Sequence, residues 1–355
     1  MSGPSFKIGP IPVGGAAPAF VIAEIGCNHE NDFARALEMI RAVGAAGAQA
    51  AKLQSFTPEK LVTRTAKKFW DIPGCPGQTQ LEEFQEIKPV FTPEQYREMQ
   101  AAAEKAGVVL FSTPCDEDWA DFLDGLGTPA FKVMSMDITH PALIRHIARK
   151  GKPVILSTGA STVPEVRAAV HAAREAGARD IALLHCISSY PTPPSETHLG
   201  MIADLRREFP DCVVGYSDHT AAGADLDASV VAVALGAKVV EKHFTFDSKR
   251  PGYDHEISAD YAGLARMVRN IRAAEALLGR DRKEPTELEA KTRAMGRRSL
   301  VAAARIPKGT PIVAAMLAAK RPGTGIPPDA LDKVVGKRAA RDIEEDATLS
   351  WEDVT

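Results

Sequence analysis

From residue 19 onward the sequence repeats one unit, in which a short apolar run is followed by a turn and then by an Ala-rich amphipathic segment. Most of the apolar runs are continuous and do not alternate with polar residues, which is typical of parallel strands buried on both faces. The pattern predicts strands at residues 19–26, 48–54, 108–114, 130–135, 153–159, 181–188, 213–219 and 237–245. Helices are expected between them, among others at residues 32–44, 93–106, 141–150, 163–176, 221–236 and 259–278.

The number of these units predicts the fold class. Eight strand–helix repeats in roughly 250 residues is the count of an α/β protein of the (β/α)8, or TIM, barrel type. A doubly wound sheet is the alternative, but such a sheet usually carries a Gly-rich dinucleotide turn, and the sequence has none. We therefore expect a barrel domain at residues 1–280, with a hairpin at residues 6–15 that plugs one end. An insertion at residues 55–90 follows the second strand, where barrel enzymes build loops over their substrates.

The chain changes character after residue 280. Residues 281–292 are charged and contain a proline, which predicts a linker. Residues 293–355 carry short β-like runs at 299–303, 311–313 and 348–351, separated by Gly- and Pro-containing turns. A β-rich domain of this size buries little core, so we expect it to lean on the barrel or on a neighbouring subunit.

Composition and charge narrow the possible partners. The 355 residues have a formal net charge of −3, which gives no electrostatic reason to expect binding to nucleic acid or to an anionic membrane. No apolar run reaches the length of a membrane span, and the first residues lack the apolar core of a secretory signal. The five cysteines are scattered without CxxC spacing, which is typical of reduced thiols. We expect a cytoplasmic protein.

Polar residues follow the body of each predicted strand. Polar groups inside apolar strands are costly unless they are paired or functional, and TIM-barrel enzymes place their catalytic groups at the C-terminal strand ends. The candidates that these ends supply are Glu24, Lys52, Gln54, Thr113, Lys132, Ser135, Asp137, Ser157, Ser188, Tyr190, Ser217, His219 and His243. We therefore expect one polar site at this end of the barrel.

Two lysines in this set are suited to an anion. Lys52 and Lys132, together with the hydroxyls of Thr113, Ser135 and Ser157, offer cationic charge and short hydrogen-bond donors, which is what a phosphate requires. The alternative is that the lysines only pair with carboxylates of the barrel.

Two histidines and three carboxylates complete the candidate chemistry. His219 and His243 end consecutive strands and suit a divalent metal whose remaining positions are open to substrate oxygens and water. The alternative is two ordinary, partly buried histidines. Glu24, Asp137 and Asp254 are candidates for acid–base catalysis or for binding hydroxyls, and the alternative for each is a salt bridge.

Several segments of the sequence resemble motifs of the sialic acid synthase (N-acetylneuraminate synthase) family. They are AEIGCNH at residues 23–29, KLQ at 52–54, FSTP at 111–114, LSTG at 156–159, His185–Cys186 with Tyr190–Pro191, SDHT at 217–220, EKHF at 241–244, RPG at 250–252 with Asp254, and KRPG at 320–323. The resemblance covers nearly the whole chain in order. It includes the legionaminate, pseudaminate and spore-coat-polysaccharide branches, and a C-terminal antifreeze-like (SAF, β-clip) domain at residues 293–355.

The resemblance implies condensation of phosphoenolpyruvate with an N-acylated amino sugar, either ManNAc-like or a dideoxy-diacetamido hexose, to give a nonulosonic acid and phosphate. By position, the residues that would hold phosphoenolpyruvate are Lys52, Thr113, Lys132, Ser135, Ser157 and Ser217. His219 and His243 would bind Mn²⁺ or Mg²⁺. The residues that would face the sugar are Glu24, Gln54, Tyr190 and Asp254, and Ser188 is a further candidate for substrate binding. Arg321 would reach in from the SAF domain, which in the family lies over the barrel of the partner in a domain-swapped homodimer.

Two departures from the family pattern leave alternatives open. Asp137 holds the position that resembles the family's catalytic glutamate, so either Asp137 or Glu24 is the main acid–base group. The insertion offers no clear match for an asparagine that contacts the sugar, so the acceptor stays open. A metal-dependent sugar-phosphate aldolase or epimerase, with Lys132 able to form a Schiff base, is one alternative function. A non-catalytic carbohydrate-binding protein is the other.

Overall fold

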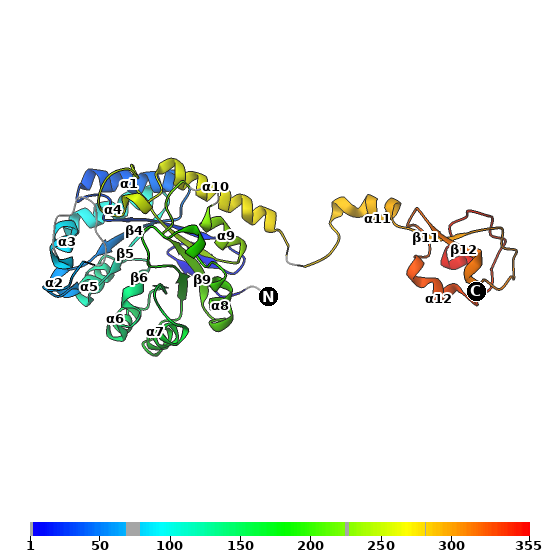
Figure 1. The fold of residues 1–355 in the computed structure, drawn as a ribbon, viewed down its shortest axis with the longest axis horizontal. Helices are drawn as coiled ribbons and strands as arrows, with labels where there is room; N and C mark the ends of the chain where they lie inside the picture. The colour runs from blue at the N-terminus through cyan, green and yellow to red at the C-terminus, as the bar shows by residue number, and fades with distance from the viewer. Residues whose placement is uncertain (1–2, 69–78, 224–226, 281) are drawn as a thin grey trace. The chain divides into compact units, whose positions relative to one another are not determined.

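Eight parallel strands close into a barrel, in the order β10-β3-β4-β5-β6-β7-β8-β9. The computed structural model describes residues 3–68, 79–223, 227–280 and 282–355, and the chain divides into an N-terminal unit, residues 1–279, and a C-terminal unit, residues 280–355 (Figure 1). The barrel strands are β3 (Phe20–Gly26), β4 (Ala50–Ser55), β5 (Val109–Pro114), β6 (Phe131–Val133), β7 (Val154–Ser157), β8 (Ile181–His185), β9 (Val213–Asp218) and β10 (Val239–His243). The predicted TIM barrel is confirmed.

A ring of helices covers the outside of the barrel (Figure 1). They are α1 (Phe33–Ala45), α4 (Pro93–Lys105), α5 (Glu117–Gly125), α6 (Pro141–Ala148), α7 (Val163–Glu175), α8 (Met201–Glu208), α9 (Ala228–Ala234) and α10 (Tyr261–Leu278). The starts of α1, α4, α5 and α10 follow from the sequence, because a capping side chain accepts a hydrogen bond from a free backbone N–H group of the first turn. Thr92 and Gln95, for example, form a capping box before α4.

Helix α9 is shorter than the predicted segment 221–236, and this part of the prediction is wrong. Gly223 has φ +89°, a left-handed conformation that an α-helix cannot contain. Asp227, in an extended conformation, then precedes the first residue of the helix. Residues 224–226 of the predicted segment lie outside the described residues.

The apolar core of this unit forms two layers. Outward-facing strand residues pack against the helices, and inward-facing residues such as Phe20 and Ile155 fill the barrel. The hairpin of β1 (Ser5–Ile8) and β2 (Ile11–Gly14) adds Ile8 and Val13 to the inner layer. The hairpin lies at the N-terminal strand ends, since a Cβ on Gly14 would meet Val213 at the start of β9. The opposite end of the barrel is thereby left for polar chemistry.

The insertion at residues 55–90 contains two short helices, α2 (Pro58–Leu61) and α3 (Gln80–Ile87). The sequence pattern did not predict α3, although Thr79 and Glu82 form a capping box at its start. Phe56 and Ile87 from this segment pack with Cys27, which follows β3. Residues 69–78 of the predicted insertion lie outside the described part of the chain.

The C-terminal unit has an apolar core of its own, built from Leu300, Ile306, Ile312, Ile326, Val334, Ile343 and Leu349 among others. Its strands β11 (Ser299–Ala302) and β12 (Leu317–Lys320) pair antiparallel. The runs predicted at 311–313 and 348–351 make isolated bridges only, because turns interrupt them before a ladder can extend.

The stretch predicted as a linker is partly helical. Helix α11 (Ala290–Gly296) begins inside it, because a capping box between Thr286 and Glu289 starts a 3-10 turn that leads into the helix. Residue 281, at the start of this stretch, lies outside the described residues. Over the described parts of the chain, no helix is both long and apolar enough to cross a membrane.

Candidate active site

The predicted site residues of the barrel gather at its C-terminal end. Because all eight strands run parallel, side chains at their last positions converge there. The residues of this group that are buried are Glu24, Lys52, Thr113, Lys132, Ser157, Ser217, His219 and His243. Gln54, Ser135, Asp137, Ser188 and Asp254 are partly exposed, and Tyr190 is 38% exposed. Arg321 belongs to the C-terminal unit, where it follows β12 and is exposed.

A buried ion pair forms the centre of the site. Lys52 Nζ lies 2.7 Å from Glu24 Oε2 and donates a hydrogen bond to Thr113 Oγ1 at 3.0 Å. Burial alone would lower the pKa of Lys52, but Glu24 and Glu241 outweigh it and hold the pKa above its ordinary value. Burial, together with the charge of Glu241, raises the pKa of Glu24. Lys52 is therefore a permanently charged group in a water-poor environment.

Glu241, to which the sequence analysis gave no role, lies between the two lysines. Its Oε1 is 3.7 Å from Lys52 Nζ and 3.7 Å from Lys132 Nζ, and it accepts a hydrogen bond from Ser217 Oγ at 3.3 Å. Burial alone would raise its pKa, but Lys132 and Lys52 outweigh it and lower the pKa. Strand alternation could have found Glu241, since it lies two positions before His243 and so shares its inward face.

Lys132 is less strongly held than Lys52. Besides the long contact with Glu241, its ammonium donates to the Val133 carbonyl at 3.4 Å. Burial lowers the pKa of Lys132, and Glu241 offsets this only in part. Its remaining hydrogen-bond capacity is available to an anion at the barrel end.

The two candidate metal ligands lie side by side, with ring centroids 5.6 Å apart. His219 Nδ1 donates to the Ile187 carbonyl at 2.8 Å, which leaves the lone pair on Nε2 free. Burial lowers the pKa of His219 to about 4. Burial and the repulsion that a protonated His219 would exert lower the pKa of His243 well below its ordinary value. Both imidazoles are neutral at pH 7, as metal ligands must be.

The two imidazoles fit a divalent metal that takes only some of its ligands from the protein. His243 Nδ1 is buried, has no hydrogen-bond partner among the described residues, and lies 3.4 Å from Asp254 Oδ2. The described residues contain no group of three His, Cys, Asp or Glu side chains arranged for a metal. Two imidazoles would thus hold a metal whose other positions are filled by substrate and water.

A cluster of small polar side chains surrounds Gly159, just beyond β7. The Gly159 N–H donates to Ser135 Oγ at 3.0 Å, and Ser135 Oγ lies 3.1 Å from Cys186 Sγ. A Cβ on Gly159 would come within 2.3 Å of Ser188 Oγ and 2.9 Å of both other side chains. Ser188 Oγ is buried without a hydrogen-bond partner among the described residues, which indicates a place for a ligand oxygen.

Asp137 lies beside this cluster, at the end of the 3-10 turn Ser135–Asp137. Its Oδ2 is buried and has no hydrogen-bond partner in the described parts of the chain. Burial raises its pKa to about 6, against the opposing charges of His140 and Lys132. A carboxyl group with this pKa can both accept and return a proton near neutral pH.

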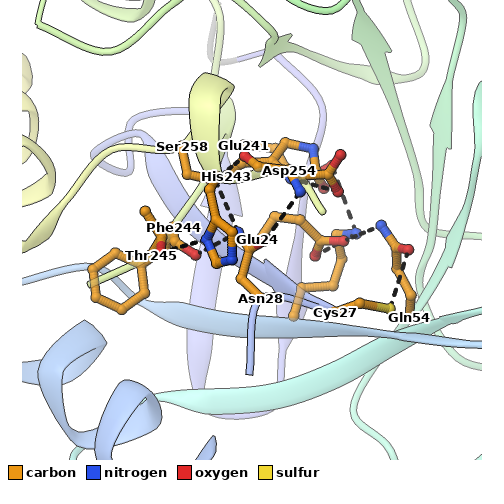
Figure 2. A network of polar contacts seen from close by, with 12 residues as sticks. Glu24, Cys27, Asn28, Gln54, Glu241, His243, Phe244, Thr245, Asp254 and Ser258 are labelled. Atoms are coloured by element: carbon orange, nitrogen blue, oxygen red, sulfur yellow. Dashed lines mark hydrogen bonds and ion pairs between the residues drawn. The ribbon is translucent and has the colours of Figure 1, made fainter. Parts of the chain in front are cut away.

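A β-bulge directs Glu24 and Gln54 toward each other. The register between β3 and β4 shifts between Glu24 and Gly26, and Gly26 has φ +54°. A Cβ at Gly26 would press against the Gln54 amide at 3.3 Å. Because Gly26 has no Cβ, the Gln54 amide has room there, and its Nε2 donates to Glu24 Oε1 at 3.0 Å. Cys27 Sγ approaches Gln54 Oε1 at 3.9 Å (Figure 2).

Two residues from loops bound the site on the histidine side. The Tyr190 ring lies against His219, with centroids 4.3 Å apart. Partial burial raises the pKa of Asp254, next to His243, to about 6. Barrel, buried charges and paired imidazoles together define an enzyme of the TIM-barrel class.

Comparison with known proteins narrows this class. The sequence model of the NeuB family matches residues 39–283, and that of the SAF domain matches residues 297–355. The N,N'-diacetyllegionaminic acid synthase of Legionella pneumophila is 35% identical over 97% of this chain and 96% of its own length. The N-acetylneuraminate-9-phosphate synthase of Homo sapiens is also 35% identical, over 96% of this chain and 94% of its own.

A solved structure agrees with these matches. The N-acetylneuraminic acid (sialic acid) synthetase of Leptospira borgpetersenii, in complex with citrate, has a TM-score of 0.73 and 30% sequence identity. The match covers 82% of this chain and 95% of that one. The chain belongs to the NeuB family and carries a C-terminal SAF domain.

Proposed function

We propose that the protein condenses phosphoenolpyruvate with an N-acylated amino sugar, ManNAc-like or a dideoxy-diacetamido hexose, to give a nonulosonic acid and phosphate. The observation that carries the proposal is the juxtaposition of two buried lysines, two buried carboxylates and two neutral imidazoles at one end of the barrel. The names of the related synthases support it. An anion, a metal and a carbonyl compound can all be accommodated by such a donor set.

Phosphoenolpyruvate would lie on the side of β4 to β7 and extend to the centre of the barrel end, where Ser217 of β9 contacts Glu241. Lys52 and Lys132 would neutralise its phosphate and carboxylate groups, which carry most of the substrate's charge. The hydroxyls that would donate to its oxygens are those of Thr113, Ser135, Ser157 and Ser217. Burial strengthens all of these contacts except that of the partly exposed Ser135, because little water competes with the ligand.

His219 and His243 would hold the divalent metal, Mn²⁺ or Mg²⁺. When bound, such a metal supplies Lewis-acid polarisation of the open-chain sugar aldehyde. The residues proposed to orient the sugar beside it are Glu24, Gln54, Ser188, Tyr190 and Asp254. The SAF domain of a second subunit in a homodimer is proposed to add Arg321.

The reaction then needs one new C–C bond and one molecule of water. C3 of the enol attacks the aldehyde carbon, and Glu24 and Glu241 stabilise the positive charge that develops at C2. The aldehyde oxygen becomes an alkoxide in this step. Water then adds at C2 while Asp137 takes one of its two protons. The C2–O bond to phosphate breaks as the ketone forms, and the proton that leaves the C2 hydroxyl passes to the alkoxide. Asp137 returns the proton to the departing phosphate. Its raised pKa, near 6, suits it to both transfers.

One observation favours a second candidate, a sugar-phosphate aldolase. The lowered pKa of Lys132 would make its amine more available for a Schiff base with a ketone substrate. Borohydride added during turnover of a sugar phosphate would then trap a covalent adduct on Lys132. The synthase predicts no adduct and an absolute requirement for phosphoenolpyruvate.

The test is a product assay on the full chain. Phosphoenolpyruvate and a mixed panel of N-acylated hexosamines and their 6-deoxy analogues are incubated with Mn²⁺ or with chelator, and products are identified by mass spectrometry. We expect phosphate release together with an acid whose mass is that of the sugar plus pyruvate, only with metal, and none from Lys132→Met. Absence of phosphate release across the panel would refute the proposal.

A further inference from the structure

Asn28, in the turn after β3, joins three points that lie far from it in the sequence. Its side-chain Nδ2 donates to the Phe244 carbonyl at 3.0 Å and to Ser258 Oγ at 2.9 Å. Its Oδ1 accepts from the Asp254 backbone N–H at 3.1 Å. These partners are 216 to 230 residues away, on both sides of the loop that carries Asp254 (Figure 2).

The chemistry of the partners requires an amide at this position. The Phe244 carbonyl can only accept a hydrogen bond, and the Asp254 backbone N–H can only donate one. Ser258 Oγ donates to the Asp254 carbonyl at 2.6 Å, so it accepts from Asn28. Of side chains with this shape, only asparagine supplies a donor and an acceptor together at every pH. An aspartate would place an oxygen against the Phe244 carbonyl.

The consequence of these bonds is the placement of one carboxylate. Asn28 and Ser258 bind the Asp254 backbone from its N–H and its carbonyl side. The Asp254 carboxylate, fixed in this way, lies 3.4 Å from His243 Nδ1. Asn28 is only 2% exposed, so it does not itself present a surface to substrate.

The rest of the loop has independent anchors. His255 Nδ1 lies 2.8 Å from Thr245 Oγ1, and its Nε2 lies 3.1 Å from Glu30 Oε1. The Ala259 N–H donates to the His243 carbonyl at 2.8 Å and closes the base of the loop. Loss of the Asn28 side chain should therefore move Asp254 without unfolding the loop.

We infer that Asn28 is a positioning residue that sets the place of Asp254 relative to His243, and through it the binding of the acceptor sugar. This inference rests on the proposed synthase function, in which Asp254 faces the sugar and phosphoenolpyruvate lies on the other side of the barrel end. Loss of the Asn28 side chain should therefore weaken binding of the sugar and leave binding of phosphoenolpyruvate unchanged.

The experiment compares steady-state kinetics of the full chain with those of Asn28→Ala, Asn28→Asp and Ser258→Ala. We expect KM for the sugar to rise about tenfold or more in both Asn28 variants, since small misplacements of a binding group are costly. Ser258→Ala should show a smaller rise, and KM for phosphoenolpyruvate should stay within about twofold in all three. The Kd for phosphoenolpyruvate, measured by calorimetry for each variant, gives the same comparison without turnover.

The matched control is Thr128→Val. Thr128 is also buried and donates to the Ala130 carbonyl at 3.0 Å, but it precedes β6 at the opposite end of the barrel. We expect it to leave both KM values unchanged. If Asn28→Asp keeps the sugar KM of the wild type, or if both KM values rise together, the inference is wrong. If the wild type itself shows no turnover, the proposed function fails instead.

Discussion

Replacing Asp137 by asparagine separates the energetic cost of a buried carboxylate from its use in the reaction. Burial raises the pKa of Asp137 from 3.8 to about 6, so the native state binds its proton more tightly than the unfolded chain does. The stabilisation that comes from this bound proton is therefore fully present below pH 3.8, and it is lost as the pH rises through 6. Asparagine has the shape of the neutral carboxylic acid and carries no charge at any pH.

The magnitude follows from the displacement of the pKa. At 1.36 kcal/mol per unit, a displacement from 3.8 to about 6 corresponds to about 3 kcal/mol above pH 7. For a barrel unit of this size that corresponds to a rise in Tm of about 5 °C for Asp137→Asn. At pH 5 the native carboxyl is mostly protonated, and the gain should fall to about half. Turnover should drop by about 10²- to 10⁴-fold, because the proton acceptor is lost.

The assay is calorimetric unfolding at pH 5 and pH 8, with turnover measured on the same preparations. Asp211→Asn, at an exposed position, is the matched control and should change Tm by less than about 1 °C at either pH. A lower Tm of Asp137→Asn at pH 8, or a gain that does not depend on pH, would refute the reasoning. Unchanged turnover would assign the proton transfer to Glu24.

Three further substitutions test the surroundings of the site. Gly159→Ala should raise KM for phosphoenolpyruvate by at least about tenfold, because the new Cβ would lie 2.9 Å from Ser135 Oγ, one of the hydroxyls proposed to bind it; an unchanged KM would exclude Ser135 from the phosphate site. His219→Ala should weaken Mn²⁺ binding by about 10-fold or more in calorimetry, and an unchanged Kd would exclude His219 as a ligand. Glu241→Gln should destabilise the protein by about 3 kcal/mol in thermal unfolding, because it leaves Lys132 under-neutralised. Inorganic phosphate should stabilise that variant more than the wild type, and an equal effect would contradict this account.

The barrel could be predicted from the sequence because its signal is local and repeated. Continuous apolar runs and Ala-rich helices recur eight times, and strand polarity then places every strand end on one side. The same logic brought Lys52, Lys132, His219 and His243 to one place, as the structure has them. The residue types alone then suggested an anion and a metal.

Contacts between distant segments could not be predicted in this way. The three hydrogen bonds of Asn28 depend on how two loops meet, and nothing in either loop alone specifies that meeting. Strand alternation places Glu241 on the inward face, but its position between two lysines depends on the barrel's register. The prediction of β-runs at 311–313 and 348–351 failed for another reason. The single bridges at Pro311 and Thr348 leave no periodic signal in the sequence.

The distances around Glu241 show how the charges of the site are balanced. A charge-assisted hydrogen bond is about 2.7–2.9 Å long, and Lys52 makes one such contact, with Glu24. Both lysines approach Glu241 only to 3.7 Å, and its Oε2 has no hydrogen-bond partner among the described residues. Glu241 therefore neutralises Lys132 at long range without using up its donors. A phosphate that enters between the lysines can take those donors without first breaking a short ion pair, and the carboxylate remains to face positive charge that develops beside it.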